Sequence, residues 1–145
     1  MDAKQEAKRL FNETWNYLDN PERSEEDNIQ MLHMAHASAY LWQSVGEPEN
    51  FARSEWQVSR VYSVLLMGEA ALLHGRRSLE ICLDGGIEGI DLVFGYEAVA
   101  RAYRILGESQ AAEEYQAQGA ACAEGISDED DRQYALGELD TIDEI

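Results

Sequence analysis

The first residues whose types and spacing could do chemistry are the histidines His33 and His36. They stand three positions apart in a stretch with helical periodicity, so both imidazoles would lie on one face of a helix. Such a pair could bind a metal, or act as acid and base, if a third group such as Glu97 or His74 came from another helix. Without a Glu-x-x-His or His-Glu-x-x-His motif, the pair is more typical of two polar helix residues. We therefore expect no metal and no cofactor, and keep a metal-dependent or acid/base site at His33, His36 and Glu97 as an alternative.

A second group combines arginines and aromatic side chains at helical spacing. Within each set the residues are three or four positions apart and offset from the apolar stripe of their helix. Arginine donates planar, bidentate hydrogen bonds to carboxylate or phosphate, and neighbouring rings add stacking area at little entropic cost. The sets are His33, His36, Tyr40 and Gln43; Arg53, Trp56 and Arg60; and Phe94, Glu97, Arg101 and Arg104. We take them as the candidate ligand-binding residues, and we assign no catalytic residue.

These arginines have a second interpretation, in which they bind acids of the same chain. Glu55, Glu69, Glu80 and Glu97 stand on the same or the neighbouring predicted helices, and ion pairs with them would hold adjacent helices in register. A binding face needs arginines whose donors are free for a ligand, whereas internal ion pairs occupy those donors. The sequence leaves both interpretations open.

The charge of the chain limits its partners. With 11 Lys and Arg against 29 Asp and Glu the formal net charge is -18, which repels phosphate backbones and anionic membrane surfaces. The longest apolar stretch, residues 61–73, is too short to span a bilayer, and the first residues do not resemble a signal peptide. We therefore expect a cytoplasmic protein that binds neither nucleic acid nor membrane. Cys82 and Cys122 lack metal-site spacing and are expected to be buried, reduced thiols.

The elements that must position these residues are helices. A chain of 145 residues with 45% hydrophobic residues and only two prolines favours one all-α domain over residues 1–145. Apolar periodicity, with glycine and proline stops, predicts about seven helices stacked as antiparallel hairpins. The hairpins span residues 2–45, 48–84 and 91–125, and a C-terminal capping helix follows at 127–142 with Ser127 as its N-cap. Its last turn carries acids at the negative end of the helix dipole, so we expect it to fray.

An internal repeat of 41 residues connects the second and third hairpins. Residues 59–65 (SRVYSVL) align with residues 100–106 (ARAYRIL), and two alanine pairs align after the turn. The pattern is a small residue, an aromatic three positions later, a turn glycine, and a small residue on the second helix. It is most complete in Val99, Ala100, Tyr103, Gly107 and Ala112, whereas Leu66 stands where the first copy should have its glycine. This pattern resembles the tetratricopeptide repeat, although it exceeds the usual 34 residues of that family.

The resemblance implies a tetratricopeptide-like (TPR-like) right-handed α-solenoid, whose concave face is lined by the first helix of each pair. Residues 33–62 are also similar to a bacterial group of tetratricopeptide-like proteins. On this resemblance the candidate residues would line the concave face, and we expect a non-enzymatic binding module for an acidic peptide or a small anionic ligand. A third alternative is a structural homo-dimer or larger oligomer that pairs through uncapped ends. The residues at that contact would be Leu10, Phe11, Trp15, Leu136 and Leu139.

Overall fold

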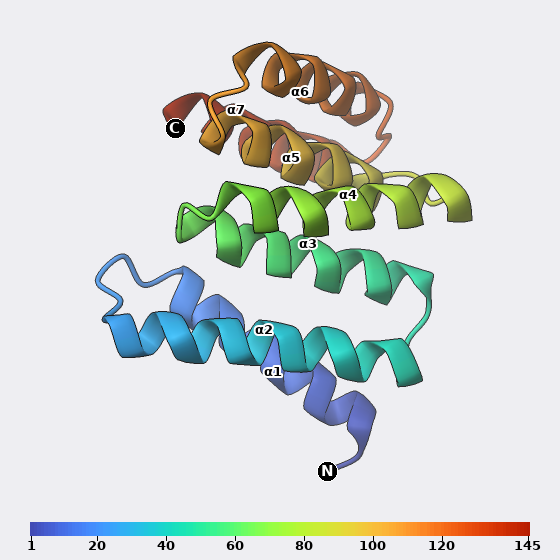
Figure 1. Ribbon diagram of the computed structural model, residues 1–145. Coiled ribbons are helices and arrows are strands. Elements are labelled where there is room, and N and C mark those ends of the chain that lie inside the picture. The colour runs from blue at the N-terminus through green and yellow to red at the C-terminus, as the bar shows by residue number, and fades with distance from the viewer.

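The computed structural model describes residues 1–145 and contains helices only, which confirms the predicted all-α class (Figure 1). Seven α-helices are followed by one 3-10 turn. Their bounds are α1 Ala3–Leu18, α2 Glu25–Val45, α3 Pro48–Val64, α4 Gly68–Gly85, α5 Ile90–Ile105, α6 Ser109–Glu124, α7 Glu129–Asp140 and η1 Thr141–Glu144. None of these helices combines the length and the apolar composition that a bilayer span needs.

Helix starts follow the capping chemistry of the sequence. Ser24 accepts from the amide of Asp27, whose carboxylate accepts in return from the amide of Ser24, so α2 opens on a capping box. The N-cap of α7 differs from the prediction. It is Asp128, which accepts from the amide of Asp131 at 2.9 Å, so naming Ser127 was wrong by one residue. A carboxylate at this place also interacts favourably with the positive end of the helix dipole.

The helices contact one another in two series. The odd-numbered helices form a continuous row, because α1 packs on α3, α3 on α5 and α5 on α7. Each even-numbered helix packs on the helices before and after it in the chain, but no Cα atom of α2 lies within 8 Å of one in α4. The same holds for α4 and α6. Helix α3 therefore lies between α2 and α4 (Figure 1).

The core is built from small residues, which bring the helices close together. A Cβ atom added at Gly75 of α4 would lie 3.2 Å from the Ala98 backbone of α5 and from the Ser59 hydroxyl of α3. One apolar cluster joins α2 and α3 around Met31 and Val61, and another joins α5, α6 and α7. The second cluster includes Ile142, which is fully buried. The last turn, for which we expect fraying, leaves the α-helix after Asp140 and continues as η1, where the burial of Ile142 opposes the unfavourable charge.

The two turns of the internal repeat have the same geometry. Leu66 and Gly107, 41 residues apart, both adopt the left-handed conformation, with φ of 60° and 77°. In each turn the next amide bonds back five residues, from Met67 to Tyr62 and from Glu108 to Tyr103, at 2.9 Å. This is the Schellman pattern of helix ends, which favours glycine. Leu66 is the only residue other than glycine with a positive φ, so the first turn holds a strained leucine where the second has glycine.

Candidate functional site

Glu97 of α5 is the centre of a buried polar cluster, which we call the Glu97 cluster. Its Oε1 atom accepts from Arg60 of α3 at 3.0 Å and from Arg101 at 2.6 Å, and its Oε2 atom accepts from Trp56 Nε1 at 2.8 Å. Arg60 also binds Glu138 of α7 at 3.0 Å. Both carboxylate oxygens of Glu97 are thus occupied by partners within the chain.

The charge of Glu97 is stabilised by these partners. Complete burial by itself would raise the pKa of this carboxyl, but the guanidinium groups of Arg60 and Arg101 outweigh it and lower the pKa. The Arg60 guanidinium also lies over the Trp56 ring, with its Cζ atom 5.3 Å from the centroid. The arrangement is that of a structural ion cluster whose members compensate one another.

Neighbouring elements cover the face on which this cluster lies. A row of rings crosses it: Trp15 of α1 lies 5.5 Å from Trp56, Phe94 stacks on Trp56 at 5.0 Å, and Tyr134 of α7 meets Phe94 edge-on. Thr141 at the end of α7 accepts from Arg101 at 2.6 Å. Residues of α1 and α7 thus contact the side chains that the sequence placed on an open concave face.

All four arginines of the candidate set have an acidic partner in the chain. Arg53 binds both carboxylate oxygens of Asp91, at 2.9 and 3.0 Å, and Arg104 lies 3.5 Å from Asp143. Arg60 and Arg101 share Glu97. Of the two interpretations left open by the sequence, the geometry of these four side chains is that of internal pairing.

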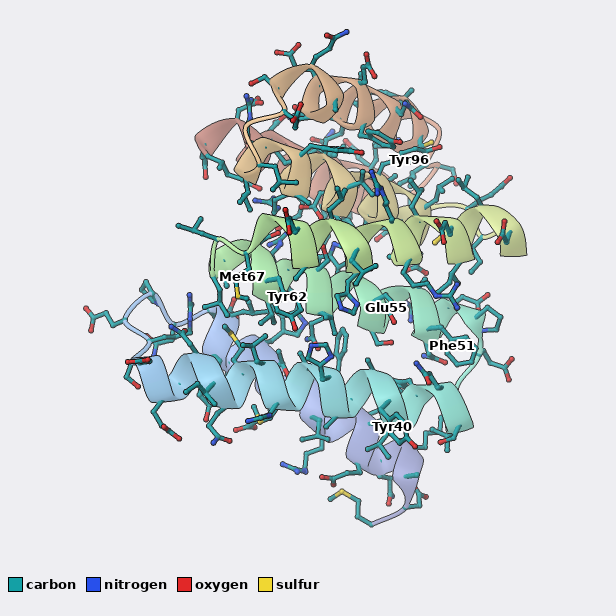
Figure 2. The ribbon with its side chains drawn as sticks, in the orientation of Figure 1. Tyr40, Phe51, Glu55, Tyr62, Met67 and Tyr96 are labelled. Atoms are coloured by element: carbon teal, nitrogen blue, oxygen red, sulfur yellow. The ribbon has the colours of Figure 1, made fainter.

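The histidines belong to a different place, which we call the histidine cluster. His36 Nε2 is 2.8 Å from the hydroxyl of Tyr62, and the Tyr62 ring stacks on His74, whose Nδ1 lies 2.7 Å from Glu55 Oε2. The rings of His36 and His74 are 5.5 Å apart and bridge α2 and α4. Burial and the neighbouring charge of His74 lower the pKa of His36. Figure 2 shows Glu55 and Tyr62 in the space between α2 and the α3–α4 pair.

The structure does not bring Glu97 to the histidines. All side-chain partners of Glu97 belong to the Glu97 cluster, His33 is exposed, and His36 pairs with Tyr62. No group of three or more His, Cys, Asp and Glu side chains in the chain has the arrangement of a metal site. The alternative site made of His33, His36 and Glu97 therefore lacks the geometry it requires.

Arg77 of α4 is not among the predicted site residues, because the sequence favours a solvent-facing side chain, or one against the next hairpin, over a functional role. It is the only arginine of the chain with neither a hydrogen bond nor an ion pair to another residue, and it is exposed. The repeat held a signal for it, because Arg77 lies 41 positions after His36 and occupies the equivalent place one repeat later. Its guanidinium has donors free for a ligand.

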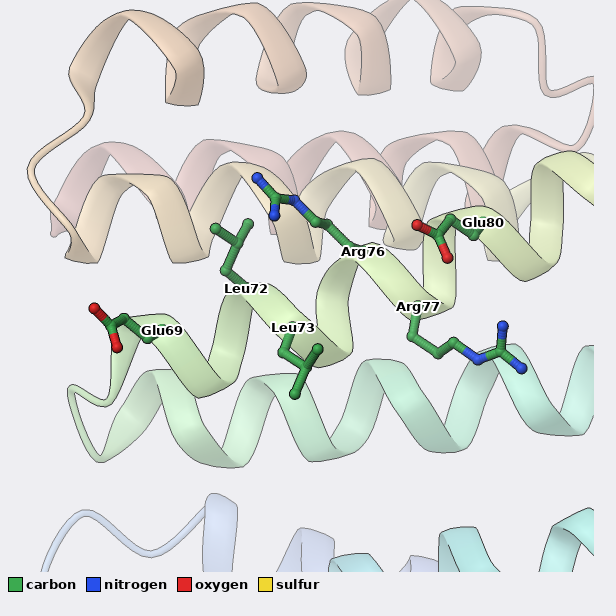
Figure 3. Close-up of a pocket in the computed structure, with 6 residues that line it drawn as sticks. All are labelled: Glu69, Leu72, Leu73, Arg76, Arg77 and Glu80. Carbon is green, nitrogen blue, oxygen red and sulfur yellow. The ribbon is translucent and has the colours of Figure 1, made fainter.

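Two depressions meet at Arg77. One, of about 260 Å³, lies between α2, α3 and α4 and is lined by Ala39, Gln43, Phe51, Ser54, Glu55, Arg77 and Ile81. The other, of about 400 Å³, runs along α4 and is lined by Glu69, Leu72, Leu73, Arg76, Arg77 and Glu80 (Figure 3). In Figure 3 Arg76 and Arg77 point to opposite sides of the helix. Arg76 reaches the hydroxyl of Tyr103 at 2.6 Å, while Arg77 remains free. We call the two depressions together the α4 groove.

The other predicted residues divide between these places. Gln43 lines the α4 groove, and Tyr40 is 72% exposed. Cys82 is buried and Cys122 is half-buried, and both are free thiols. The five residues proposed for an oligomer contact are all at least half-buried inside the chain, and Leu139 is 2% exposed. They are therefore not the exposed apolar surface that the dimer alternative assumed.

Comparisons with known proteins find no relative of this chain. The chain matches no protein-family model, no curated protein and no solved structure. The function therefore has to be inferred from the geometry of the chain itself.

Proposed function

We propose that this chain is a non-enzymatic binding module that takes an acidic peptide segment into the α4 groove. The observation that carries the proposal is Arg77, the one arginine left without a partner in a chain whose acids outnumber its Lys and Arg by 29 to 11. In such an acidic chain a free guanidinium is not explained by a shortage of internal acids. It lies where two depressions meet, so a ligand in either one reaches it.

Arg77 attracts a carboxylate and the apolar side chains of the groove can cover a neighbouring hydrophobic residue, whereas Glu55, Glu69 and Glu80 line the same groove and limit how many acids a peptide can place there. Leu73 is 66% exposed beside Arg77, and Phe51 and Ile81 line the other depression. A carboxylate could pair with the Arg77 fork while an adjacent apolar side chain covers Leu73. Gln43 supplies a further amide donor. Of the residues predicted from sequence, Gln43 thus belongs to the proposed site, together with Arg77.

We also propose that the scaffold is a TPR-like right-handed stack of hairpins. Several features support this. The two repeat turns share one hydrogen-bond pattern, the odd-numbered helices form a continuous row, and the small residue Ser59 lies close enough to α4 to donate to the Ala71 carbonyl at 2.7 Å. A peptide in the α4 groove would then lie on the side of the even-numbered helices, opposite to the face that the family resemblance implied.

The test uses a fluorescein-labelled decapeptide of alternating Glu and Leu, titrated with the protein in a fluorescence anisotropy assay. Arg77→Glu should weaken binding at least tenfold, because it replaces an attraction by a repulsion at the centre of the groove. Lys8→Glu is the matched control, since it makes the same change in net charge on exposed α1 and should leave affinity within twofold.

Two further arms define what is recognised. A Lys/Leu decapeptide should not bind, and succinate should not displace the acidic peptide at millimolar concentration. Equal effects of Arg77→Glu and Lys8→Glu would contradict the proposal. Displacement by succinate would instead indicate a small anion as the ligand of the same guanidinium.

A further inference from the structure

Ser63 of α3 has a buried hydroxyl without a partner. It is one of five buried serines, and the other four each donate to a backbone carbonyl. Ser63 is 4% exposed and its Oγ atom makes no hydrogen bond. An unpaired buried hydroxyl is costly, so this exception suggests a place that is completed by something outside the chain.

Ser63 is one of the residues that line a depression of about 380 Å³ at the end of α3 and α5. The lining residues are Ser63, Val64, Leu66, Arg101, Ile105 and Ile145, of which four are apolar. Arg101 is 8% exposed, and its Nη1 atom makes no hydrogen bond, whereas Nε and Nη2 are bound to Glu97 and Thr141. This depression is separate from the α4 groove and shares no residue with it.

Two further buried donors near Arg101 lack an acceptor, although their arginines do not line the depression. Besides the Ser63 hydroxyl, the Nε atoms of Arg60 and Arg104 are buried without an acceptor. Arg60 shares Glu97 with Arg101, and Arg104 lies one helical turn after it. A ligand that satisfies this place must therefore bring acceptors, and a carboxylate brings two oxygens without any donor.

The apolar wall contains the strained residue of the fold. Leu66 keeps a left-handed conformation although the equivalent Gly107 shows that the turn accepts glycine. Its side chain is 73% exposed, so packing in the core does not explain the leucine. Strain that is kept at the rim of a depression points to a role for the side chain there.

From these observations we infer that Ser63, Arg101 and Leu66 form a binding site for a straight-chain monocarboxylic acid. Ser63 and Arg101 hold its carboxylate, and Leu66, Val64 and Ile105 cover its alkyl chain. The depression is at the small end of the range for ligand pockets, which suits an unbranched chain of several carbons. This site is independent of the proposed peptide groove, so an experiment can disprove one proposal without affecting the other.

The test is calorimetric titration of the full chain with a homologous series from butyrate to octanoate. Each added methylene should tighten Kd about fourfold, which corresponds to about 0.8 kcal/mol per buried CH₂. Octanol has the same chain without the charge and should bind at least tenfold more weakly than octanoate. An affinity that ignores chain length, or octanol that binds as tightly as octanoate, would overturn the inference.

Two variants separate binding from folding. Ser63→Ala removes an unpaired hydroxyl, so it should fold as well as the wild type but bind octanoate about tenfold more weakly. Leu66→Gly should raise the thermal midpoint and yet weaken the binding of octanoate about fivefold. Loss of folding cannot produce these two changes together. Leu83→Ala removes another exposed leucine, on α4, and is the matched control. Wild-type affinity in both Ser63→Ala and Leu66→Gly would refute the site.

Discussion

The hairpins α3–α4 and α5–α6 are related by the 41-residue repeat and differ at two aligned positions that flank a shared tyrosine. Where the first has Glu55 and His74 beside Tyr62, the second has Tyr96 and Tyr115 beside Tyr103. In the second hairpin these three rings pack together, with centroid distances of 5.6 and 6.4 Å. In the first, the same positions hold a Glu–His hydrogen bond and a stacked Tyr–His pair. Tyrosines alone are enough to pack this site, so the titratable groups of the first hairpin are not required by the fold.

At another pair of aligned positions the acidic residue is in the second hairpin and the aromatic ring is in the first. Trp56 of α3 aligns with Glu97 of α5, while Arg60 aligns with Arg101, and the two arginines converge on the single glutamate. Here the second hairpin carries the charge and the first carries the ring. The two hairpins share their turn geometry but carry different side chains at these aligned positions, so the positions accept different chemistry when their neighbours compensate.

The largest effect is expected at Glu97. Glu97→Gln leaves Arg60 and Arg101 buried beside a neutral amide, and it should lower the free energy of unfolding by about 3 to 5 kcal/mol, as for other broken buried ion pairs. Urea unfolding followed by circular dichroism measures this. Glu138→Gln is the control. Because the Glu138 side chain is 24% exposed, this substitution should lower the free energy of unfolding by only about 1 kcal/mol. Equal losses in the two variants would mean that Glu97 is not the centre of the cluster.

The next effect comes from exchanging the residues of the two turns. Gly107→Leu forces a side chain into a left-handed position and should cost about 1 to 2 kcal/mol. Leu66→Gly should instead stabilise by about 0.5 kcal/mol, because relief of strain exceeds the entropy cost of glycine. Thermal unfolding of both variants tests whether the turns are equivalent. A destabilised Leu66→Gly would show that they are not.

The histidine cluster should make stability depend on pH in a way that the tyrosine cluster cannot. His36 faces His33, His74, Glu55 and Tyr62, and its pKa is lowered in the folded state. The unfolded chain therefore binds this proton more readily, so stability falls as pH drops through about 6.5 and stops falling below the lowered pKa. Chemical unfolding measured between pH 7.5 and 5.5 should show that the free energy of unfolding depends less steeply on pH in His36→Gln than in the wild type. The exposed His33→Gln is the control, and an unchanged slope in His36→Gln would count against the assignment.

The smallest effect concerns the thiols. Burial raises the pKa of Cys82 to about 11, so very little thiolate is present at pH 8. When the native protein is labelled with a thiol reagent, Cys122 should therefore be modified first and Cys82 should react slowly. Cys122→Ala should remove the rapid phase without changing the fold. A rapid phase that survives in this variant would show that Cys82 is more accessible than its burial implies.

Several features of the molecule could be predicted from local sequence. Ser24 and Asp27 fixed a helix start, Pro48 opened α3, and the 41-residue repeat identified equivalent positions such as Leu66 and Gly107. These depend on neighbours within a few residues, for which helical geometry is enough. The candidate site was predicted less well. Trp56, Arg60, Glu97 and Arg101 do converge, but they meet one another and α7, and Arg77 was passed over.

The sequence by itself determined the helices, the capping box at Ser24 and the repeat, because each depends on spacing along one helix or on a comparison of the chain with itself. Only the tertiary structure decided which arginine is free. Arg60 finds Glu138 78 positions away, and Arg53 finds Asp91 38 positions away. Such partners are set by how helices cross, and a rotation of one residue turns a helix by about 100° and changes every partner on it. The same crossing leaves Arg77 without an acid and Ser63 without an acceptor.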